Sequence, residues 1–331
     1  MLIDLQLALL LGALLPGSAK AAVPYRLVPP PLDTPWTEKV GTNPWPQYPR
    51  PQLRRDVWQS LNGIWTYQAA KGAGDVASPP TLPLNQEVLI PSCIESGLSG
   101  IMTIGVTHMW FGTTFTVPRR WTDGRRVLLN FEAVDYEATV LVNGDEVGFN
   151  RGGYSRFSLD ITDSLIDGDN ELMVFVFDPT DDQSIPQGKQ TKRMSHIFYT
   201  PCSGIWQTVW LESFPDNFIT SLDVSADMEG HVDVVVHSHT KTSRPVEITV
   251  EDAKGHVVGS HQHASDQPIR FTVPSPKLWS PDSPTLYNIT VKMGDDEVQS
   301  YTGFRTISSG VINGIKRPLL NGEFVFRGSG V

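Results

Sequence analysis

The chain has 331 residues, 40% hydrophobic and 19% charged, which is typical of folded proteins and leaves room for about two domains. Its formal net charge of −10 and the lack of any basic run exclude a nucleic-acid-binding surface. With 28 Gly, 26 Pro and many short β-branched runs, the sequence favours an all-β fold.

The N-terminus begins with an apolar stretch over residues 5–15, which a Pro-Gly-Ser turn and the small-residue sequence Ala19-Lys20-Ala21 follow. This order predicts a secretory signal peptide over residues 1–21 and a secreted, extracellular protein, although no Lys or Arg precedes the apolar run. The alternative is a buried N-terminal segment. The run is too short to cross a bilayer, so no membrane partner is expected.

Residues 22–52 are rich in Pro and Trp and predict an extended surface arm. Residues 53–215 then alternate between short apolar-polar runs and turn signals. Residues 172–177 are apolar on both faces, which indicates a strand in the middle of a sandwich or one covered by the arm. The other expected strands cover residues 64–68, 110–117, 126–131, 138–142, 146–148, 157–161 and 205–212, and about eight strands suit a jelly-roll β-sandwich.

A second unit is expected over residues 216–308. Val232, Val234 and Val236 share one strand face, and a later strand alternates from Tyr287 to Met293. About seven short strands in this span have the rhythm of an immunoglobulin-like β-sandwich.

The decapeptide at residues 203–212, Ser-Gly-Ile-Trp-Gln-Thr-Val-Trp-Leu-Glu, resembles the end of the N-terminal sugar-binding domain of glycoside hydrolase family 2. That family includes β-galactosidases, β-glucuronidases and β-mannosidases. Further matches follow in the family's order at residues 61–65, 142–144, 279–281 and 303–305. One departure is Phe111-Gly112-Thr113, which stands where the family usually has an aromatic residue followed by Arg.

This resemblance implies a galactose-binding-like jelly roll followed by the family's immunoglobulin-like domain. Residues 309–331 would lead into a (β/α)₈ barrel, which carries both catalytic Glu residues in the family and needs about 250 more residues. The expected function is therefore the N-terminal portion of a secreted glycoside hydrolase of β-linked sugars, inactive as an isolated chain. The alternatives are a non-catalytic carbohydrate-binding or interaction protein, and a gene model that ends early.

The expected partners are a carbohydrate, a catalytic barrel domain and further copies of this chain, which would associate through the surface that a barrel would cover. No cofactor is expected. No catalytic residue is assigned either, since the cluster of Glu132, Asp135 and Glu137 is better explained as solvated or turn-stabilising acids.

The resemblance places an acid that faces the substrate in the loop after residue 178. Asp181 is the main candidate for a sugar contact, with Lys189 and Gln190 next, and the alternative for Asp181 is an Asp-rich turn. Trp206 is a candidate stacking platform, although core Trp residues are more common. Glu95 is a further candidate that could instead brace its loop.

The two cysteines, Cys93 and Cys202, lie in loops with family-like motifs and are expected to form a disulfide, the alternative being two buried thiols. His237/His239 and His261/His263 form His-x-His pairs with metal-compatible spacing, but no obvious further ligand accompanies them. They are therefore interpreted as solvated histidines, and no metal site is predicted. Asn288 begins an Asn-Ile-Thr glycosylation sequon on an outward strand face.

Overall fold

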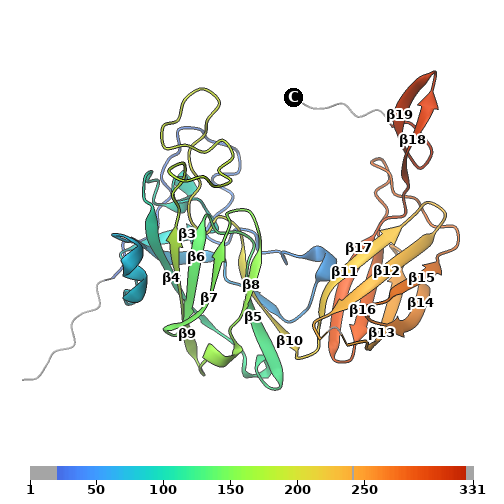
Figure 1. Ribbon diagram of the computed structural model, residues 1–331, viewed down its shortest axis with the longest axis horizontal. Coiled ribbons are helices and arrows are strands. Elements are labelled where there is room, and N and C mark those ends of the chain that lie inside the picture. Colours follow the sequence, from blue (N-terminus) through green and yellow to red (C-terminus); the bar gives the residue numbers. More distant parts are fainter. Residues whose placement is uncertain (1–20, 241, 326–331) are drawn as a thin grey trace, which may run out of the picture.

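The computed structural model describes residues 21–240 and 242–325 as two β-sandwiches in succession, followed by a projecting hairpin (Figure 1). The predicted signal peptide lies outside the described residues except for its last position. The all-β prediction is confirmed, since the only helices in the described ranges are 3₁₀ turns of three to five residues.

The first sandwich is built from a six-stranded sheet in the order β3-β2-β4-β9-β6-β7 and a four-stranded sheet in the order β1-β10-β5-β8, with every pairing antiparallel. Its strands are β1 (Trp58–Ser60), β2 (Gly63–Ala69), β3 (Gln86–Ile90), β4 (His108–Thr116), β5 (Arg125–Phe131), β6 (Glu137–Val142), β7 (Asp145–Arg151), β8 (Phe157–Asp160), β9 (Asp169–Phe177) and β10 (Val209–Pro215).

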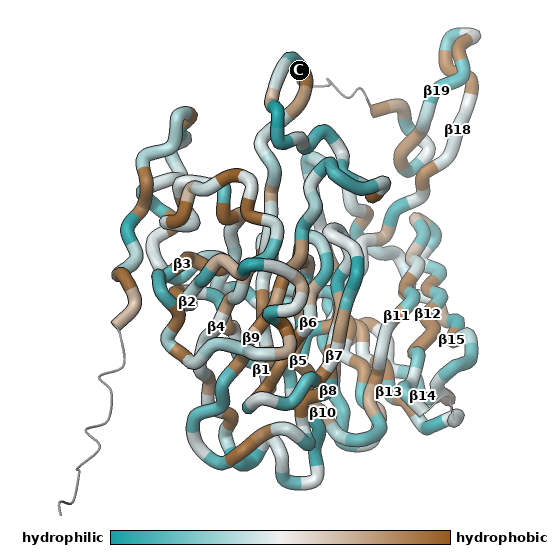
Figure 2. The backbone as a smooth tube through the Cα atoms, turned by 60° about the vertical axis from the view of Figure 1, so that its left-hand side comes forward, coloured by the Kyte–Doolittle hydropathy of each residue, from teal (hydrophilic) through white to brown (hydrophobic). Residues whose placement is uncertain are grey.

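The core lies between these two sheets, where alternate residues of each strand meet. Val127 and Leu129 of β5 face inward with Val140 of β6 and Val174 of β9, and all four are fully buried. Because side chains of a strand alternate between faces, this pattern follows directly from the period of two in the sequence. Figure 2 shows hydrophobic residues concentrated along the central strands.

Strand β9 is apolar on both faces for a reason that the sequence did not specify. One face contributes to the core, while Met173 and Phe175 on the other face pack with Trp110 and Leu84. Residues 70–82, which include the 3₁₀ turn η2 (Ala73–Ala77), supply Val76 and other contacts to this second cluster. The outer face is thus covered by the β2–β3 connection and not by the N-terminal arm.

The second sandwich pairs a three-stranded sheet, β11-β12-β15, with a four-stranded sheet, β14-β13-β16-β17. Its strands are β11 (Ile219–Ala226), β12 (His231–Ser238), β13 (Pro245–Glu251), β14 (Val257–Ala264), β15 (Pro268–Thr272), β16 (Tyr287–Met293) and β17 (Asp296–Thr302). The hairpin β18 (Ile307–Ile312) and β19 (Ile315–Leu320) projects beyond it (Figure 1). The hairpin begins before the predicted boundary at residue 308, which falls inside β18.

The N-terminal arm is extended, as its composition indicates, and it follows the jelly roll closely. Val23 pairs in parallel with the edge of β3, donating to the Asn85 carbonyl at 2.9 Å and accepting from Glu87 N at 2.8 Å. Tyr25 then lies over Gly100, where a side chain at a φ of +81° would meet the ring. The arm therefore extends the sheet edge that β3 would otherwise leave open.

Where the arm reaches the second domain, Arg55 forms the centre of a buried ionic network. Its guanidinium makes a bidentate contact with Asp296 at 2.8–2.9 Å and also donates to the Ile219 carbonyl at 2.6 Å. Glu212 of β10 lies 3.6 Å from the same guanidinium and accepts hydrogen bonds from Tyr48 and Arg50. The network joins the arm, the jelly roll and the second sandwich.

Candidate functional site

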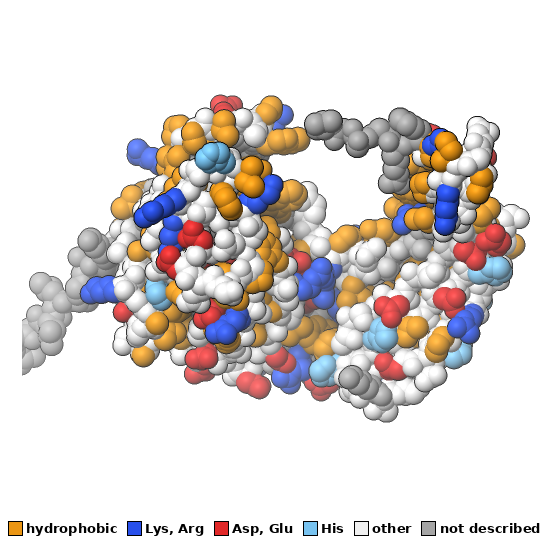
Figure 3. All heavy atoms as spheres, turned by 45° about the horizontal axis from the view of Figure 1, so that its top comes forward, with side chains coloured by type: hydrophobic (Ala, Val, Ile, Leu, Met, Phe, Trp, Pro, Cys, Tyr) orange, Lys and Arg blue, Asp and Glu red, His pale blue; other side chains and the backbone are white. Residues whose placement is uncertain are grey.

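The loop between β9 and β10, residues 178–208, crosses one end of the jelly roll and carries most of the candidate site residues (Figure 1). It contains no strand, and a parallel bridge between Gln190 and Tyr199 gives it shape. Its middle exposes Met194, Phe198 and other apolar side chains. Figure 3 shows basic side chains beside hydrophobic ones over this end of the molecule.

The strand predicted over residues 205–212 was wrong in its first half, because β10 begins only at Val209. Gly204 instead forms an isolated antiparallel bridge with Asp135, in which each N–H donates to the other carbonyl at 2.9 Å. The backbone polar groups of this segment are thus paired with a neighbouring loop and not with a sheet.

A disulfide joins Cys93, in the loop after β3, to Cys202, with 4.7 Å between the two Cα atoms. The two residues are 109 positions apart in the sequence, so the bond ties the end of the 178–208 loop to a distant part of the jelly roll. This arrangement differs from the alternative of two buried thiols.

Glu95 follows Cys93 by two residues and is only 7% exposed. Its two carboxylate oxygens accept hydrogen bonds from Ser203 N at 2.9 Å and from Ser203 Oγ at 2.7 Å. A carboxylate with both oxygens engaged and almost no exposure cannot reach a sugar. Of the two interpretations of Glu95, the structure supports the one in which it braces the loop.

Asp135 and Asp178 are buried beside Glu95 and complete an acid cluster. Burial raises the pKa of Glu95 to about 7, against two hydrogen bonds from Ser203 that lower it. Burial and the charge of Asp178 raise the pKa of Asp135 to about 7, while a hydrogen bond with Gln190 opposes the change. Burial also raises the pKa of Asp178. A charged carboxylate loses its hydration here, so protonation is favoured.

A pKa near 7 is a property of general acids in glycoside hydrolysis, but access decides the function here. Asp135 is 6% exposed and Asp178 is 2% exposed. The carboxyl of Asp135 also lies so close to Gly153 that any side chain there would clash with it. In this arrangement the three acids contact the loop and its neighbours and are closed to solvent.

Glu132, Asp135 and Glu137, which the sequence analysis interpreted as solvated or turn-stabilising acids, have different environments in the structure. Glu132 lies 3.7 Å from Arg156, and Glu137 lies 2.8 Å from Arg151, in half-exposed ion pairs. Asp135 is 6% exposed, so it is not solvated, and only the turn-stabilising alternative remains for it. Sequence reasoning missed this position because the alternation of strand β6 does not extend to the residues before it.

The three polar candidates of the loop take part in its internal contacts. Asp181 accepts from Thr191 Oγ1 at 2.6 Å and from the backbone N–H of residue 192 at 3.3 Å, and the Thr191 hydrogen bond lowers its pKa. Gln190 Nε2 donates to the Tyr154 hydroxyl at 2.9 Å, and its Oε1 accepts from the backbone of residue 202. Lys189 is exposed, with its Nζ 5.8 Å from the centre of the Tyr199 ring.

Trp206 is half-buried and is not a core residue. Its indole N–H donates to the Gly153 carbonyl at 2.9 Å, and the edge of Tyr154 lies against it with 6.1 Å between ring centres. The ring lines a groove of about 610 Å³ between the N-terminal arm and the jelly roll, together with Trp45, Tyr48, Pro91, Glu132, Gln207 and Thr208. Trp45 is 70% exposed and was not among the sequence candidates.

This groove combines features that suit a sugar. Indole rings at Trp45 and Trp206 offer apolar faces for the C–H surface of a pyranose. Glu132, Gln207 and Thr208 offer hydroxyl, amide and carboxylate groups for its hydroxyls. The Trp45 and Trp206 side chains lie far apart in the sequence, so only the fold brings them to one groove. We refer to this groove as the Trp45–Trp206 groove.

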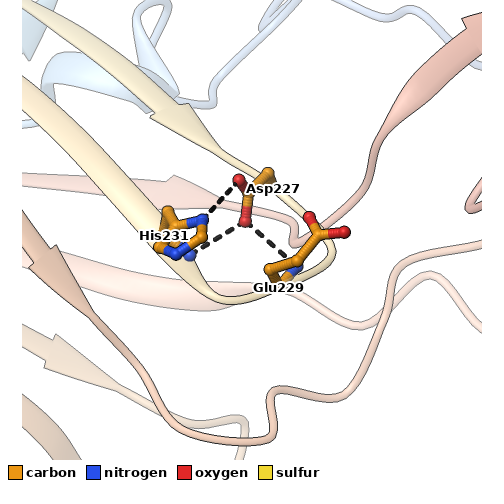
Figure 4. Close-up of side chains that lie close together, drawn as sticks. All are labelled: Asp227, Glu229 and His231. Atoms are coloured by element: carbon orange, nitrogen blue, oxygen red, sulfur yellow. Dashed lines mark hydrogen bonds and ion pairs between the residues drawn. The ribbon is translucent and has the colours of Figure 1, made fainter.

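In the second sandwich, Asp227, Glu229 and His231 bring three potential metal ligands within 4.8 Å of one another (Figure 4). Asp227 accepts from the backbone N–H of the other two residues at 3.0 and 2.9 Å, and its Oδ2 lies 2.8 Å from His231 Nδ1.

The same turn recurs between β13 and β14, where Asp252 accepts from the backbone N–H groups of Lys254 and His256, both at 2.8–2.9 Å. His256 Nδ1 lies 3.1 Å from the Asp252 carboxylate. The recurring element keeps the Asp, the Gly and the His but has Lys254 where the first turn has Glu229. In both turns the Asp side chain stabilises the hairpin by accepting backbone hydrogen bonds, so the grouping of Asp227, Glu229 and His231 is explained without a metal ion.

The His-x-His pairs do not converge on a common point. His237 Nε2 lies 2.7 Å from Asp223 Oδ2, His239 stacks on Phe218, and His261 stacks on Phe271. Asn288 is exposed on β16, as expected for a glycosylation acceptor.

Two family models match consecutive parts of the chain. The one described as "Glycosyl hydrolases family 2, sugar binding domain" matches residues 81–215, and "Glycosyl hydrolases family 2" matches residues 215–305. A β-glucuronidase of Paenibacillus borealis is 27% identical over 86% of this chain and 50% of its own length. A β-galactosidase of Priestia megaterium is 27% identical over 80% of this chain and 30% of its own length.

Solved structures show the same arrangement. A β-glucuronidase from an uncultured Clostridium species has a TM-score of 0.66 at 25% identity, over 82% of this chain and 48% of that one. For a Ruminococcus gnavus β-glucuronidase in complex with D-glucuronic acid, the TM-score is 0.69 at 22% identity, over 83% of this chain and 50% of that one.

This chain thus spans half or less of the length of these four relatives. None of the helices in the described part of the protein has the length and hydrophobicity of a bilayer span. The matched domains, their order and the fold show that the chain belongs to glycoside hydrolase family 2, with its sugar-binding domain followed by its immunoglobulin-like domain.

Proposed function

We propose that this chain is the carbohydrate-binding portion of a secreted glycosidase acting on β-linked sugars, and that the Trp45–Trp206 groove contributes to sugar binding. The observation that carries the proposal is the convergence of two indole rings and several polar groups in a groove of about 610 Å³ on a domain of a sugar-binding family. Hydrolysis would require a catalytic barrel, with which these two domains would form one enzyme.

Binding can be measured by tryptophan fluorescence and calorimetry with methyl β-galactoside, methyl β-glucuronide and methyl β-mannoside. We expect saturable binding of at least one of them, weakened about fivefold to thirtyfold by Trp45→Ala or Trp206→Ala, since stacking on an aromatic ring contributes on the order of 1–2 kcal/mol. Trp36→Ala is the matched control, because Trp36 is exposed on the same arm but lies outside the groove. Equal sugar binding by all variants would exclude the Trp45–Trp206 groove as the binding site.

The isolated chain is expected to release no product from aryl β-glycosides. The acid cluster of Glu95, Asp135 and Asp178 is closed to solvent, and Glu132 and Glu137 are paired with Arg156 and Arg151. Turnover by the purified chain at the rates of a complete glycosidase would contradict this. The non-catalytic alternative predicts sugar or protein binding with no hydrolysis even when a barrel domain is supplied.

Secretion is supported by the leader pattern of residues 1–21 and by the disulfide, which is typical of oxidising compartments. Expression in a eukaryotic secretory host should deliver the protein to the medium with a new N-terminus near residue 22. A glycosidase-sensitive mass at Asn288 should accompany it. Retention inside the cell with the leader intact would argue against secretion.

Self-association is proposed through the hairpin β18–β19 and its base. Ile307 is 73% exposed and Val311 is 69% exposed, and Ile307 lines a pocket of about 610 Å³ together with Trp279, Phe324 and others. Exposed apolar surface of this kind favours association. Sedimentation over a range of concentrations should show a mass that increases with concentration, and Val311→Lys should reduce that increase.

A further inference from the structure

Four Asn-Gly steps occur in the described residues, at Asn62, Asn143, Asn313 and Asn321. Asn-Gly is the dipeptide most prone to deamidation, because glycine leaves the following amide nitrogen open to approach by the Asn side chain. The reaction depends on whether the side-chain amide is free to turn toward that nitrogen. The four positions differ in this respect.

Three of the steps share one backbone geometry, which makes them comparable. Asn143, Asn313 and Asn321 have φ of 52°, 51° and 52°, and their glycines have φ of 88°, 77° and 81°. Each pair forms the two-residue loop between antiparallel partners, as a type I′ turn requires. Differences in reactivity among them must therefore come from the side chains.

The side chain of Asn143 is fixed by three hydrogen bonds. Its Oδ1 accepts from Glu171 N at 2.9 Å, and its Nδ2 donates to the Ser164 carbonyl at 2.7 Å and to Asn170 Oδ1 at 2.8 Å. An amide held in this way cannot rotate without losing all three contacts.

Asn321 and Asn62 are also held. Asn321 Oδ1 accepts from Thr306 N at 2.9 Å and its Nδ2 donates to the Trp279 carbonyl at 3.1 Å. Asn62 Oδ1 accepts from Val209 N at 3.0 Å, and its Nδ2 donates to backbone oxygens of the arm and to Thr208.

Asn313 differs from all three. It is exposed at the tip of the β18–β19 hairpin, and its side chain makes no hydrogen bond with any residue in the described ranges. We propose that Asn313 is a site of spontaneous deamidation, at which the folded protein accumulates aspartate and isoaspartate while its other Asn-Gly steps stay intact.

The reaction needs only water. The Gly314 amide nitrogen loses its proton to solvent and attacks Cγ of Asn313, the bond between Cγ and Nδ2 of Asn313 breaks, and ammonia leaves. The resulting five-membered succinimide is opened by water at either carbonyl, which gives an Asp or an isoaspartyl residue and a new carboxylate. No oxidant, reductant or cofactor takes part.

The isoaspartyl product places an extra methylene group in the main chain of a two-residue loop. A type I′ turn has no room for an added backbone atom without a change in strand register, so the closing pair of the hairpin, Ile312 and Ile315, should loosen. The modification would also place a negative charge beside the apolar residues that we propose for self-association.

The test is peptide mass spectrometry of the intact secreted protein after incubation at neutral to mildly alkaline pH, with isoaspartate counted by enzymatic methylation. We expect the Asn313 peptide to gain the mass of an amide-to-acid exchange at least about tenfold faster than the peptides of Asn143 and Asn321, since the latter must first lose two or three hydrogen bonds. In denaturant the four steps should react at similar rates.

Two variants complete the test. Asn313→Gly keeps a turn that tolerates positive φ and should abolish the fast phase, while Asn170→Ala, which removes one partner of Asn143, should speed reaction at Asn143 only. If Asn313 in the folded protein reacts no faster than Asn143, the proposal is overturned. These rates do not depend on sugar binding, so failure here would leave the proposed function unaffected.

Discussion

The molecule contains two buried groups of acids that are neutralised in opposite ways. At the domain junction, Glu212 and Asp296 are fully or almost fully buried and are paired with Arg50 and Arg55. At the end of the jelly roll, Glu95, Asp135 and Asp178 are also buried, but among the described residues no Lys or Arg forms an ion pair with them. Lys192 lowers the pKa of Asp178 only from a distance.

The comparison shows that a buried carboxyl group can hold two domains together in one region and make another region sensitive to pH. A carboxylate with a bidentate Arg stays charged and joins two domains by geometry. A carboxylate without a cation is favoured in its protonated form, so its neighbourhood depends on pH. The acid cluster lies under the 178–208 loop, which carries the sugar-contact candidates, whereas the ionic network lies at the domain junction.

The largest effect on stability is expected from removing an arginine of the ionic network at the domain junction. Arg55→Met should lower the free energy of unfolding by about 3–5 kcal/mol, because it leaves Asp296 buried without a cation, while Glu212 keeps Arg50. Urea unfolding followed separately by Trp fluorescence and circular dichroism would measure it. Arg54→Met is the matched control, since Arg54 and Asp56 are exposed and 3.9 Å apart, and it should change the value by less than about 0.5 kcal/mol. Equal effects of the two variants would contradict the comparison.

The second largest effect on stability is expected from removing the disulfide between Cys93 and Cys202. Replacing both Cys93 and Cys202 by Ser should cost about 2–5 kcal/mol, because the bond closes a loop of 109 residues. Trypsin should also cut faster after Lys189, Lys192 and Arg193, which lie in the released loop. An unchanged cleavage pattern would mean that Glu95 and Gln190 hold the loop without the disulfide.

The stability of the protein should depend on pH because of the buried acids that lack a paired cation. The folded-state pKa values of Glu95 and Asp135, about 7, lie above those of the unfolded protein. Between about pH 4 and pH 7 the folded state then binds more protons than the unfolded state, so stability falls as pH rises through this window. The fall should be on the order of 3–4 kcal/mol for each of the two acids, and stability should no longer change above about pH 8.

Glu95→Gln mimics the protonated acid and should flatten this slope, so that the variant at pH 8 is at least as stable as the parent. Glu132→Gln is the control, because Glu132 is paired with Arg156 outside the cluster. The melting temperatures of the parent and both variants at pH 5 and pH 8 test this prediction. A parent protein that is equally stable at both values would rule out the cluster as the source of any pH response.

The smallest effect on stability is expected from the exposed ion pair of Asp227 and His231. Asp227 raises the pKa of His231 through a hydrogen bond and its charge, so the added stability is present below the unfolded pKa of His and disappears as pH rises through the folded value. Nuclear magnetic resonance should show the pKa of His231 above the usual value of a histidine side chain, and Asp227→Asn should remove the difference. Unfolding free energies should barely change, since both groups are exposed.

Much of the fold could be predicted from local pattern. The alternation of β5, β6 and β16, the apolar run of β9 and the Asn143-Gly144 turn identified strands and a hairpin, because these signals depend only on neighbouring residues. The 205–208 segment was misassigned for the same reason, since its alternation continues that of β10 while the backbone at Gly204 pairs with the distant loop at Asp135. Local pattern contains no information about such pairing.

The site was only partly predictable. Glu95, Gln190 and Trp206 were named from the sequence as candidates for sugar contacts, but their hydrogen bonds to Ser203, Tyr154 and Gly153 depend on tertiary contacts. Trp45 and Asp178 were missed, because nothing in their neighbouring residues signals a groove or a buried acid.

The sequence by itself determined the all-β class, the order of the two domains and the family, because strand period, turn residues and ordered motifs are local properties. Only the tertiary structure decided which acids are compensated, which of four Asn-Gly steps is free and which indoles share a groove. Charge neutralisation and hydrogen bonding depend on distances of a few ångströms between residues that lie tens to hundreds of positions apart. Those distances exist only once the two sandwiches have formed.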